Sequence, residues 1–360
     1  MTLCLNMIVR DEAAVIARCL ASVRPFIDHW LIVDTGSTDD TPARVRAALD
    51  GIPGTLAHRP WRNFGHNRNE ALELARGCAD YLLFIDADET LNVASGTQRP
   101  RLDSSAYSLE ARYGSMRYDR VGLVSTALPW RWQGVVHEFL DAGQPVAQPR
   151  LPGWAIEVRS EGARSRDPDK YLKDAALLEA ALRDDPNDPR HVFYLAQSYR
   201  DAGRLEEALA QYERRVTLGG WEEEAWYAAW QCAVLIERLG YAHGQIVAAY
   251  LSTWERRPSR AEPLVELARY FRQRDEWHNA ELFAGKAAAI SMPLDRLFVD
   301  VATYIWRARD ELALTAFYTG RVSEARQLWQ ALLDGGELPP GERLRIVANL
   351  GFAAKPRTNE

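Results

Sequence analysis

The sequence has 360 residues, and this length predicts two domains, or three, because a single hydrophobic core seldom serves a chain this long. Its composition, 47% hydrophobic and 26% charged, is typical of a folded soluble protein. The net charge of -6 argues against a nucleic-acid-binding protein, because such proteins usually carry a basic surface.

The cysteines and the N-terminus exclude further classes. The four cysteines include no Cys-x-x-Cys pair and lie in apolar or helical contexts, so we expect neither a disulfide nor a zinc site. The N-terminus lacks the basic segment of a signal peptide, and no segment approaches the roughly 20 apolar residues that span a bilayer. We therefore predict a cytoplasmic protein and leave a peripheral membrane location open.

The first third of the chain alternates short apolar runs with helical patterns. Strand patterns cover residues 3–9, 29–37, 54–60 and 80–90. Helix patterns cover residues 11–26, 39–50 and 65–77. Such an alternation predicts a parallel sheet covered by helices.

Residues 90–160 differ in character from the first third. They hold several prolines and short β-like stretches such as residues 105–113 and 135–140. We interpret them as the mixed end of the same sheet together with loops. The charged stretch over residues 159–171 contains Gly, Ser and Pro and predicts a hinge before a helical region.

From about residue 169 onward almost every segment has a helical period, with turn signals about every 30 to 40 residues. Residues 192–218, 264–290 and 310–334 place small and aromatic residues at the spacings of a tetratricopeptide unit. This pattern predicts stacked helical hairpins with a shared core and a concave face. The predicted domains are therefore residues 1–165, with an α/β fold, and residues 166–360, with helical repeats.

Three of the predicted strands end in polar, mostly acidic residues. These ends are Arg10–Glu12, Asp34–Thr41 and Asp86–Glu89. In an open parallel sheet ligands bind at the C-terminal ends of the strands, so the three ends form one candidate site. Each end also fits a helix cap or a solvated turn, and that interpretation remains open at this point.

The stretch "YLLFIDADET", residues 81–90, is an apolar run that ends in three acids. Asp86 and Asp88 are alternate residues, so on a strand end their carboxylates turn toward one point, whereas Glu89 points elsewhere and begins the next turn. Hard oxygen ligands at this spacing suit a divalent ion that takes its other oxygens from water and a diphosphate. The stretch predicts a corner for a metal and phosphates.

Four stretches together resemble the family 2 glycosyltransferases, inverting enzymes of the GT-A fold. They are "LNMIVRDEAAVIARCLASV", "LIVDTGSTDDT", "GHNRNEALELA" and "YLLFIDADE", within roughly residues 2–140. The resemblance is to the branch that joins this domain to tetratricopeptide repeats. It implies a GT-A domain with a mostly parallel, Rossmann-like sheet, a DxD motif, and hexosyl transfer from a UDP-sugar with Mn or Mg as cofactor.

The resemblance also implies roles for single residues. Asp34 contacts uracil or ribose, Asp86 approaches the ribose, and Asp88 holds the metal that stabilises the leaving diphosphate. Arg68 matches a family arginine near the nucleotide; an arginine that caps its own helix is the alternative. The residues expected at the nucleotide-sugar are Val9, Arg10, Glu12, Asp34, Arg68, Asp86 and Trp132.

An inverting transfer needs a carboxylate opposite the departing nucleotide, to deprotonate the acceptor. The candidate is Glu138 in "WRWQGVVHEFL", where Trp130, Trp132 and Val136 would floor a sugar site; a glutamate on an edge strand of a Trp-rich core is the competing interpretation. His137 either completes the metal shell, binds a phosphate, or is an ordinary polar residue. On a regular strand it would face away from Glu138.

The chain departs from the family pattern at one point. Family members often use a histidine later in the sheet domain as a further metal ligand, and residues 139–190 contain none. Either His137 serves, or the metal is held by Asp88, phosphates and water. Arg164, Arg166 and Lys170 either close over the diphosphate or form a solvated charge run.

Two functions of different classes follow from these observations. The set of acids and Arg68 favours an enzyme that moves a sugar to a peptide, protein or saccharide acceptor. The alternative is a catalytically weak sugar-nucleotide domain whose repeats hold a protein partner. The repeats also suit a homodimer through exposed apolar helix faces. A nucleotidyltransferase is disfavoured, because "VRDEAA" lacks the glycine-rich loop of that class.

Overall fold

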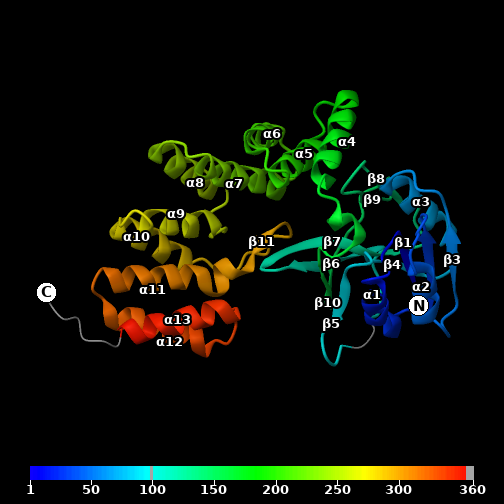
Figure 1. Ribbon diagram of the computed structural model, residues 1–360, viewed down its shortest axis with the longest axis horizontal. Coiled ribbons are helices and arrows are strands. Elements are labelled where there is room, and N and C mark those ends of the chain that lie inside the picture. The colour runs from blue at the N-terminus through cyan, green and yellow to red at the C-terminus, as the bar shows by residue number, and fades with distance from the viewer. Residues whose placement is uncertain (98–99, 354–360) are drawn as a thin grey trace. The chain divides into compact units, whose positions relative to one another are not determined.

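A computed structural model describes residues 1–97 and 100–353 of the chain. The chain divides into two compact units, Met1–Gln211 and Tyr212–Glu360 (Figure 1). The last strand of the first unit ends at Glu157, before the domain boundary predicted at residue 165. The first unit also includes the helices that follow, up to Gln211.

The first unit begins with the predicted alternation of strands and helices. Its elements are β1 (Leu3–Val9), α1 (Ile16–Val23), β2 (His29–Asp34), α2 (Thr41–Ala48), β3 (Gly54–His58), α3 (Phe64–Leu74) and β4 (Tyr81–Phe84). The neighbouring strands in the order β3-β2-β1-β4 are parallel. Their C-terminal ends therefore lie along one edge of the sheet, where ligands of such sheets bind.

The sheet continues with the mixed end that the sequence predicts. The additional strands are β5 (Thr90–Val93), β6 (Ala106–Tyr113), β7 (Met116–Ser125) and β10 (Arg150–Glu157). They extend the order to β4-β7-β6-β10-β5, with β7 antiparallel to β4 and β6, and β10 parallel to β6. A separate hairpin consists of β8 (Arg131–Gln133) and β9 (Phe139–Asp141).

Two predicted strands are shorter than their patterns suggest. β4 ends at Phe84, and Ala87 and Asp88 form a turn, so strand alternation does not orient the acids that follow. The stretch 135–140 is largely the loop between β8 and β9, where His137 has a φ of 52°. In both places the polar residues lie in a turn and not on a regular strand.

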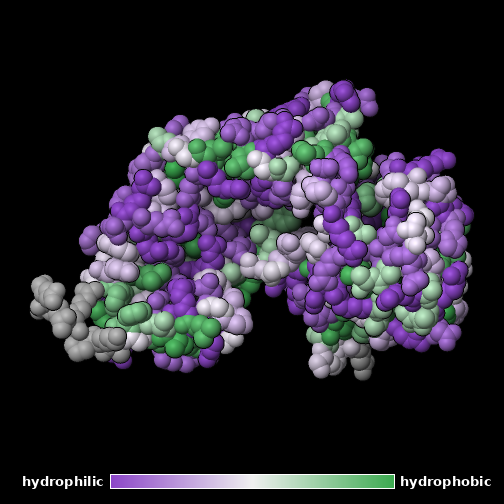
Figure 2. All heavy atoms as spheres, viewed as in Figure 1, coloured by the Kyte–Doolittle hydropathy of each residue, from purple (hydrophilic) through white to green (hydrophobic). Residues whose placement is uncertain are grey.

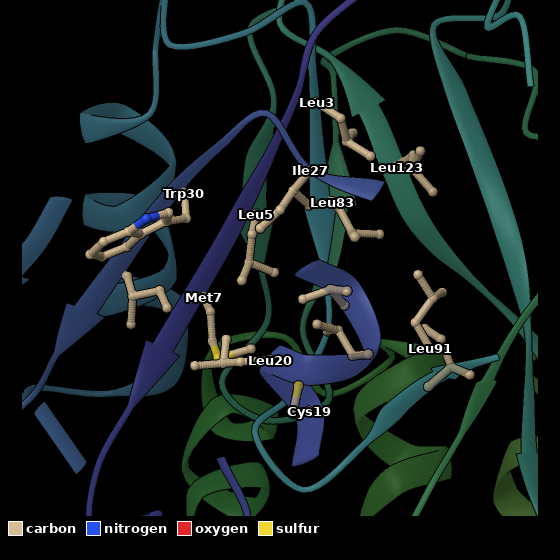
Figure 3. Close-up of a cluster of buried hydrophobic side chains, with 14 of the residues drawn as sticks. Leu3, Leu5, Met7, Cys19, Leu20, Ile27, Trp30, Leu83, Leu91 and Leu123 are labelled. Carbon is tan, nitrogen blue, oxygen red and sulfur yellow. The ribbon is translucent and has the colours of Figure 1, made fainter. Parts of the chain in front are cut away.

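The sheet has a hydrophobic core on each face, because its strands alternate their side chains. Leu5 and Met7 of β1 pack with Cys19 and Leu20 of α1, as the close-up in Figure 3 shows. Cys4, which directly precedes Leu5 on β1, faces the opposite core. Each fully buried aliphatic side chain of this kind contributes about 1.5–3 kcal/mol to folding, so the strand-end loops rest on a stable platform.

The helical region follows the predicted hairpin pattern. In the first unit a 3-10 turn, η2 (Ala163–Arg166), leads into α4 (Lys170–Asp184) and α5 (Pro189–Asp201), and α6 (Leu205–Thr217) crosses the division between the units. The second unit contains α7 (Glu222–Arg238), α8 (His243–Arg256), α9 (Glu262–Arg272), α10 (Trp277–Ala288), a short strand β11 (Val299–Asp300), a π-helical turn η3 (Thr303–Arg307), α11 (Ala308–Tyr318), α12 (Val322–Asp334) and α13 (Pro340–Ala353).

Within the second unit each helix from α7 to α13 packs against the next. The small residues of the repeat pattern are buried where paired helices meet, among them Ala268, Ala280, Ala284, Ala313 and Ala325. Apolar residues also gather on the surface over α12 and α13 (Figure 2), where Leu344 is 74% exposed. The homodimer prediction concerns helix faces of this kind. Among the described helices, none combines the length and the apolar character needed to cross a membrane.

Candidate active site

The loops after β1 and β2 are tied together by hydrogen bonds at the sheet edge. Asp11, with a φ of 55°, accepts a hydrogen bond from the amide of Thr38 at 2.7 Å, and its own amide donates to Ser37 Oγ at 3.0 Å. The amide of Glu12 donates to Thr41 Oγ1 at 2.8 Å. These bonds place two of the predicted strand ends side by side.

Asp34 lies in this edge, buried at the end of β2. It is in register with Val9 of β1, and its Oδ2 lies 3.0 Å from His58 Nδ1. Its Oδ1 accepts the amide of Ser37 at 3.1 Å. Arg10 is exposed and extends beside Asp11 instead. Of the residues expected near the nucleobase, Val9 and Asp34 therefore lie within the protein and Arg10 at its surface.

Arg68 of α3 joins Asp86, after β4, to the candidate base Glu138. Its Nη2 donates to Asp86 Oδ1 at 2.7 Å, and its Nε lies 3.7 Å from Glu138 Oε2. Its guanidinium also lies over the ring of Trp132, 4.9 Å from the centroid. The structure thus brings four predicted site residues together, and Arg68 does not cap its own helix.

A second arginine, Arg120 of β7, holds Asp86 from the other side. Arg120 Nη1 lies 3.6 Å from Asp86 Oδ2, and Arg120 Nη2 donates to the buried Glu89. Burial alone would raise the pKa of Asp86, but the charges of Arg68 and Arg120 outweigh burial and lower it. Asp86 is therefore a fixed anion between two cations.

The expectation for Glu89 is wrong. We expected Glu89 to point away and begin the next turn, whereas its side chain is 3% exposed and accepts the amide of Asp86 at 2.9 Å. The reason is the turn after β4, which folds Glu89 back under Asp86, where Arg120 compensates its charge. Nothing in the sequence near Arg120 marks it as the partner, because β7 is far from β4 along the chain.

Glu138 has the environment of a carboxylate prepared for proton transfer. Its side chain is 7% exposed, and among the described residues its Oε1 has no hydrogen-bond partner. Burial raises the pKa of Glu138, and Arg68 opposes this effect. A buried carboxylate with one uncommitted oxygen has both the basicity and the lone pair to take a proton from a bound hydroxyl.

The N-terminal half of α3 positions the loop that carries Glu138. Asn69 binds the main chain of Trp132 twice, donating to its carbonyl and accepting from its amide, each at 2.9 Å. A Cβ on Gly65 would lie 3.1 Å from the carbonyl oxygen of Gly134, so only glycine lets the loop approach this closely. Asn69 is not among the site residues predicted from the sequence. Its position directly after Arg68, a predicted site residue, is the signal that could have pointed to it.

Asp88 and Glu12 lie together under the segment 160–166. The amide of Gly162 donates to Asp88 Oδ2 at 3.1 Å, and the amide of Ala163 donates to Glu12 at 3.2 Å. Burial raises the pKa of Asp88 and brings that of Glu12 to about 7, while these amides oppose the effect. The stretch predicted as a hinge therefore contacts the acidic corner directly.

His137 lies apart from the acids, against α5. Its ring stacks on Tyr194 with centroids 4.0 Å apart, and its carbonyl accepts a hydrogen bond from Arg190 Nη2 at 2.7 Å. Although His137 keeps an exposed face, crowding by protein atoms and the charges of Arg190, Arg164 and Lys170 lower its pKa to about 3. His137 lies in a turn and not on a regular strand, so the expectation that strand alternation would orient it away from Glu138 does not apply.

The described residues contain no group of three or more His, Cys, Asp or Glu side chains arranged to hold a metal ion. Asp88, with Glu12 beside it, supplies only carboxylate oxygens. Such a donor set fits Mg²⁺ or Mn²⁺ when water and phosphate oxygens complete the shell. The predicted metal position at Asp88 thus agrees with the chemistry of the residues present.

Comparison with known proteins identifies the class of the N-terminal segment. Residues 4–94 match the model of the family described as glycosyl transferase family 2. This segment contains β1 to β4, Asp34, Arg68 and the Asp86–Glu89 turn. The resemblance noted from the sequence is confirmed: a family 2 glycosyltransferase segment with a mostly parallel, GT-A-like sheet precedes tetratricopeptide-like helical hairpins.

Particular relatives cover parts of the chain. A TPR repeat-containing protein from Synechococcus elongatus is 37% identical over 161 residues, 42% of this chain and 38% of its own length. The lipopolysaccharide core biosynthesis glycosyltransferase LpsC from Rhizobium meliloti is 36% identical over 102 residues, 28% of this chain and 34% of its own. The chain thus matches less than two fifths of the length of either relative.

A solved tetratricopeptide repeat protein from Parabacteroides merdae is also similar in structure. The two chains are 18% identical, and the match covers 51% of this chain and 67% of the other with a TM-score of 0.40.

Proposed function

We propose that this protein is a metal-dependent inverting glycosyltransferase that moves a hexose from a UDP-sugar to an acceptor hydroxyl or other nucleophile. The observation that carries the proposal is the buried Glu138, with one uncommitted oxygen, joined through Arg68 to Asp86 in a family 2 segment. The proposed base Glu138, the cation Arg68 and the carboxylate Asp86, which is proposed to face the nucleotide, then lie within one network. A degenerate binding domain would have no need of a buried carboxylate oxygen without a hydrogen-bond partner.

The donor side of the proposed site follows the edge of the sheet. Val9 and Asp34 would bind the uridine, with Glu12 and the exposed Arg10 at its border, and Asp86 would face the ribose. A divalent cation held by Asp88 would act as a Lewis acid on the leaving diphosphate. Asp88 and Glu12 each accept one amide hydrogen bond from the segment 160–166, and each carboxylate keeps further lone pairs with which it could bind the cation.

The acceptor side of the proposed site is formed by the loop between β8 and β9. Glu138 would remove the proton from the attacking group as the new bond to the anomeric carbon forms on the face opposite the nucleotide. Arg68 would keep Glu138 ionised and in place, and Trp132 would line the sugar. The cations around His137 disfavour a metal ion there. We therefore propose Asp88 as the protein ligand of the metal and place His137 near an anionic group of a ligand.

The test is incubation of the full chain with a panel of UDP-sugars and Mn²⁺, measuring release of UDP and the shift of the melting temperature by UDP. We expect at least one donor to give slow UDP release, because water replaces the acceptor when none is added. Release that stops on addition of EDTA and returns with Mn²⁺ would support the metal. Neither UDP release nor a UDP-dependent thermal shift would contradict the proposal and favour the binding module.

A further inference from the structure

Four side chains next to the loop of Glu138 form a layered stack, which we call the Arg190 stack. The guanidinium of Arg190 on α5 lies 4.9 Å from the ring centroids of both Phe139 and Tyr194, and His137 stacks on Tyr194. Phe139 is 43% exposed. The stack thus joins α5 to the β8–β9 hairpin and presents aromatic surface beside the candidate base.

The guanidinium of Arg190 packs against aromatic rings, and some of the N–H donors at its edge stay free to bind a ligand. A guanidinium has five N–H donors in one plane. One Nη2 donor binds the carbonyl of His137, and Nε is buried and cannot reach a ligand, so the donors that remain for a ligand are those of Nη1 and the second hydrogen of Nη2. Rings fix the plane while donors at the edge remain available, an arrangement suited to forked binding of a phosphate or carboxylate.

The surroundings of the stack carry an excess of positive charge. Arg164 and Lys170 are close enough to His137 for their charges to depress its pKa. Arg164 is neutralised by Asp174, whereas within residues 1–97 and 100–353 neither Arg190 nor Lys170 has a carboxylate within 4 Å. His137 is neutral at pH 7 and adds no charge. Arg190 and Lys170 are therefore the two cations here that could bind an anion.

Two side chains of the stack come from the hairpin that carries Glu138, and not from the strand ends that carry the proposed nucleotide residues. His137 and Phe139 flank Glu138 in sequence, whereas Asp34 and Asp88 follow β2 and β4. In an inverting transfer the acceptor occupies the side of the base. A ligand of the stack would consequently be part of the acceptor.

We propose that the Arg190 stack, with Lys170, is an acceptor subsite that binds a saccharide carrying a phosphate or carboxylate group. The inference rests on the proposed function, since it assigns Glu138 to the acceptor. Phe139 offers a face for the sugar ring, and Arg190 and Lys170 bind its anionic group. α5 then supplies the selectivity and the sheet supplies the chemistry.

The test measures binding of small probes to the full chain by saturation-transfer NMR: glucose 6-phosphate, glucuronate, glucose and inorganic phosphate. We expect one charged sugar to bind more tightly than glucose, and Arg190→Gln and Lys170→Gln each to weaken it by about tenfold, the effect of one charge-assisted hydrogen bond. Comparison of the two charged sugars distinguishes phosphate from carboxylate. Arg183→Gln, an exposed arginine on α4, is the matched control and should change nothing.

A parallel UDP thermal shift with Mn²⁺ separates the possible failures. The proposal is overturned if charged sugars bind no better than glucose, or if Arg190→Gln leaves their binding intact. It is also overturned if Arg190→Gln weakens UDP as strongly as the charged sugar, because the cations would then serve the donor diphosphate. If wild type binds the charged sugars but neither binds nor releases UDP, the proposed function fails and the anion site stands alone.

Discussion

At the scale of single residues, Glu138 differs from the other acids of the sheet edge because one of its oxygens is buried without a hydrogen-bond partner among the described residues. We predict that Glu138→Gln lowers UDP release in the presence of acceptor by about 100-fold or more, the usual contribution of a general base. UDP binding should persist, since glutamine keeps the shape and Arg68 retains Asp86. Steady-state rates and a UDP titration measure the two effects.

The control for Glu138 is Glu73→Gln on α3, where the side chain is 64% exposed and pairs with Arg76. This variant should match the wild type in rate and affinity. Near-normal turnover of Glu138→Gln would assign the base elsewhere.

Asp88 carries the metal prediction. Replacement by alanine should abolish the Mn²⁺ dependence of UDP binding, because the remaining carboxylate, Glu12, supplies too few oxygens for a hydrated cation. Calorimetric titration of Mn²⁺ in the presence of UDP measures this directly, and urea unfolding without metal checks that the variant is folded. A Mn²⁺ affinity equal to that of the wild type would exclude Asp88 as the ligand.

The pair of Glu89 and Arg120 yields a stability prediction. Arg120→Gln leaves the buried Glu89 without its cation and should lower the free energy of unfolding by about 3 kcal/mol. The double variant Glu89→Gln/Arg120→Gln should lose less, because neither side chain then buries a charge. Urea denaturation of the three proteins completes a double-mutant cycle, and equal losses in the single and double variants would argue against this explanation.

At the scale of secondary-structure elements, the N-terminus of α3 sets the position of the Glu138 loop. Gly65→Ala adds a methyl group 3.1 Å from the Gly134 carbonyl, and the loop must move by a few tenths of an ångström. We predict a several-fold lower kcat with little change in melting temperature, because misplacement of a catalytic group is costly while alanine favours the helix. Turnover and thermal melting measure both quantities.

The control for Gly65 is Gly244→Ala, which also changes the second residue of a helix, α8, but meets no atom within 4 Å. It should leave kcat unchanged. An equal loss of kcat in both variants would show that contact with the loop is not the cause.

At the scale of the whole molecule, the second unit contains a buried network of charged side chains. In the second unit Arg260 is 1% exposed, binds Glu262 and Asp295, and lies 4.0 Å from the ring centroid of Trp226. We predict that Arg260→Met destabilises the chain by about 3 kcal/mol or more, because two buried carboxylates lose their cation. UDP release at low temperature should persist, since none of these residues belongs to the proposed active site.

Urea unfolding and UDP release of Arg260→Met give the measurement. Arg204→Gln, at an exposed pair with Glu207, should leave both unchanged. Loss of UDP release in a folded Arg260→Met would contradict the view that this network only stabilises the fold.

The local sequence determined much of the architecture. The apolar runs predicted both ends of β1 correctly and the start of β2, and the predicted end of β2 lies in the loop that follows it. The reason is that a buried strand needs a continuous apolar stretch. Small residues at repeat spacing located the hairpins α9–α10 and α11–α12, because close helix pairs exclude larger side chains there. The acids after β2 and β4 and Arg68 could be found for the same reason: strand ends in a parallel sheet share an edge.

Only the tertiary structure decided which of these groups touch. Arg120 reaches Asp86 and Glu89 because β7 pairs with β4, and Arg190 reaches the Glu138 loop because α5 packs beside β9. Periodicity could not predict either contact, since the partners are 31 and more residues apart in sequence. A pattern along the chain records which face a residue prefers, whereas charge pairing depends on strand order and loop conformation, which form only when the whole sheet folds.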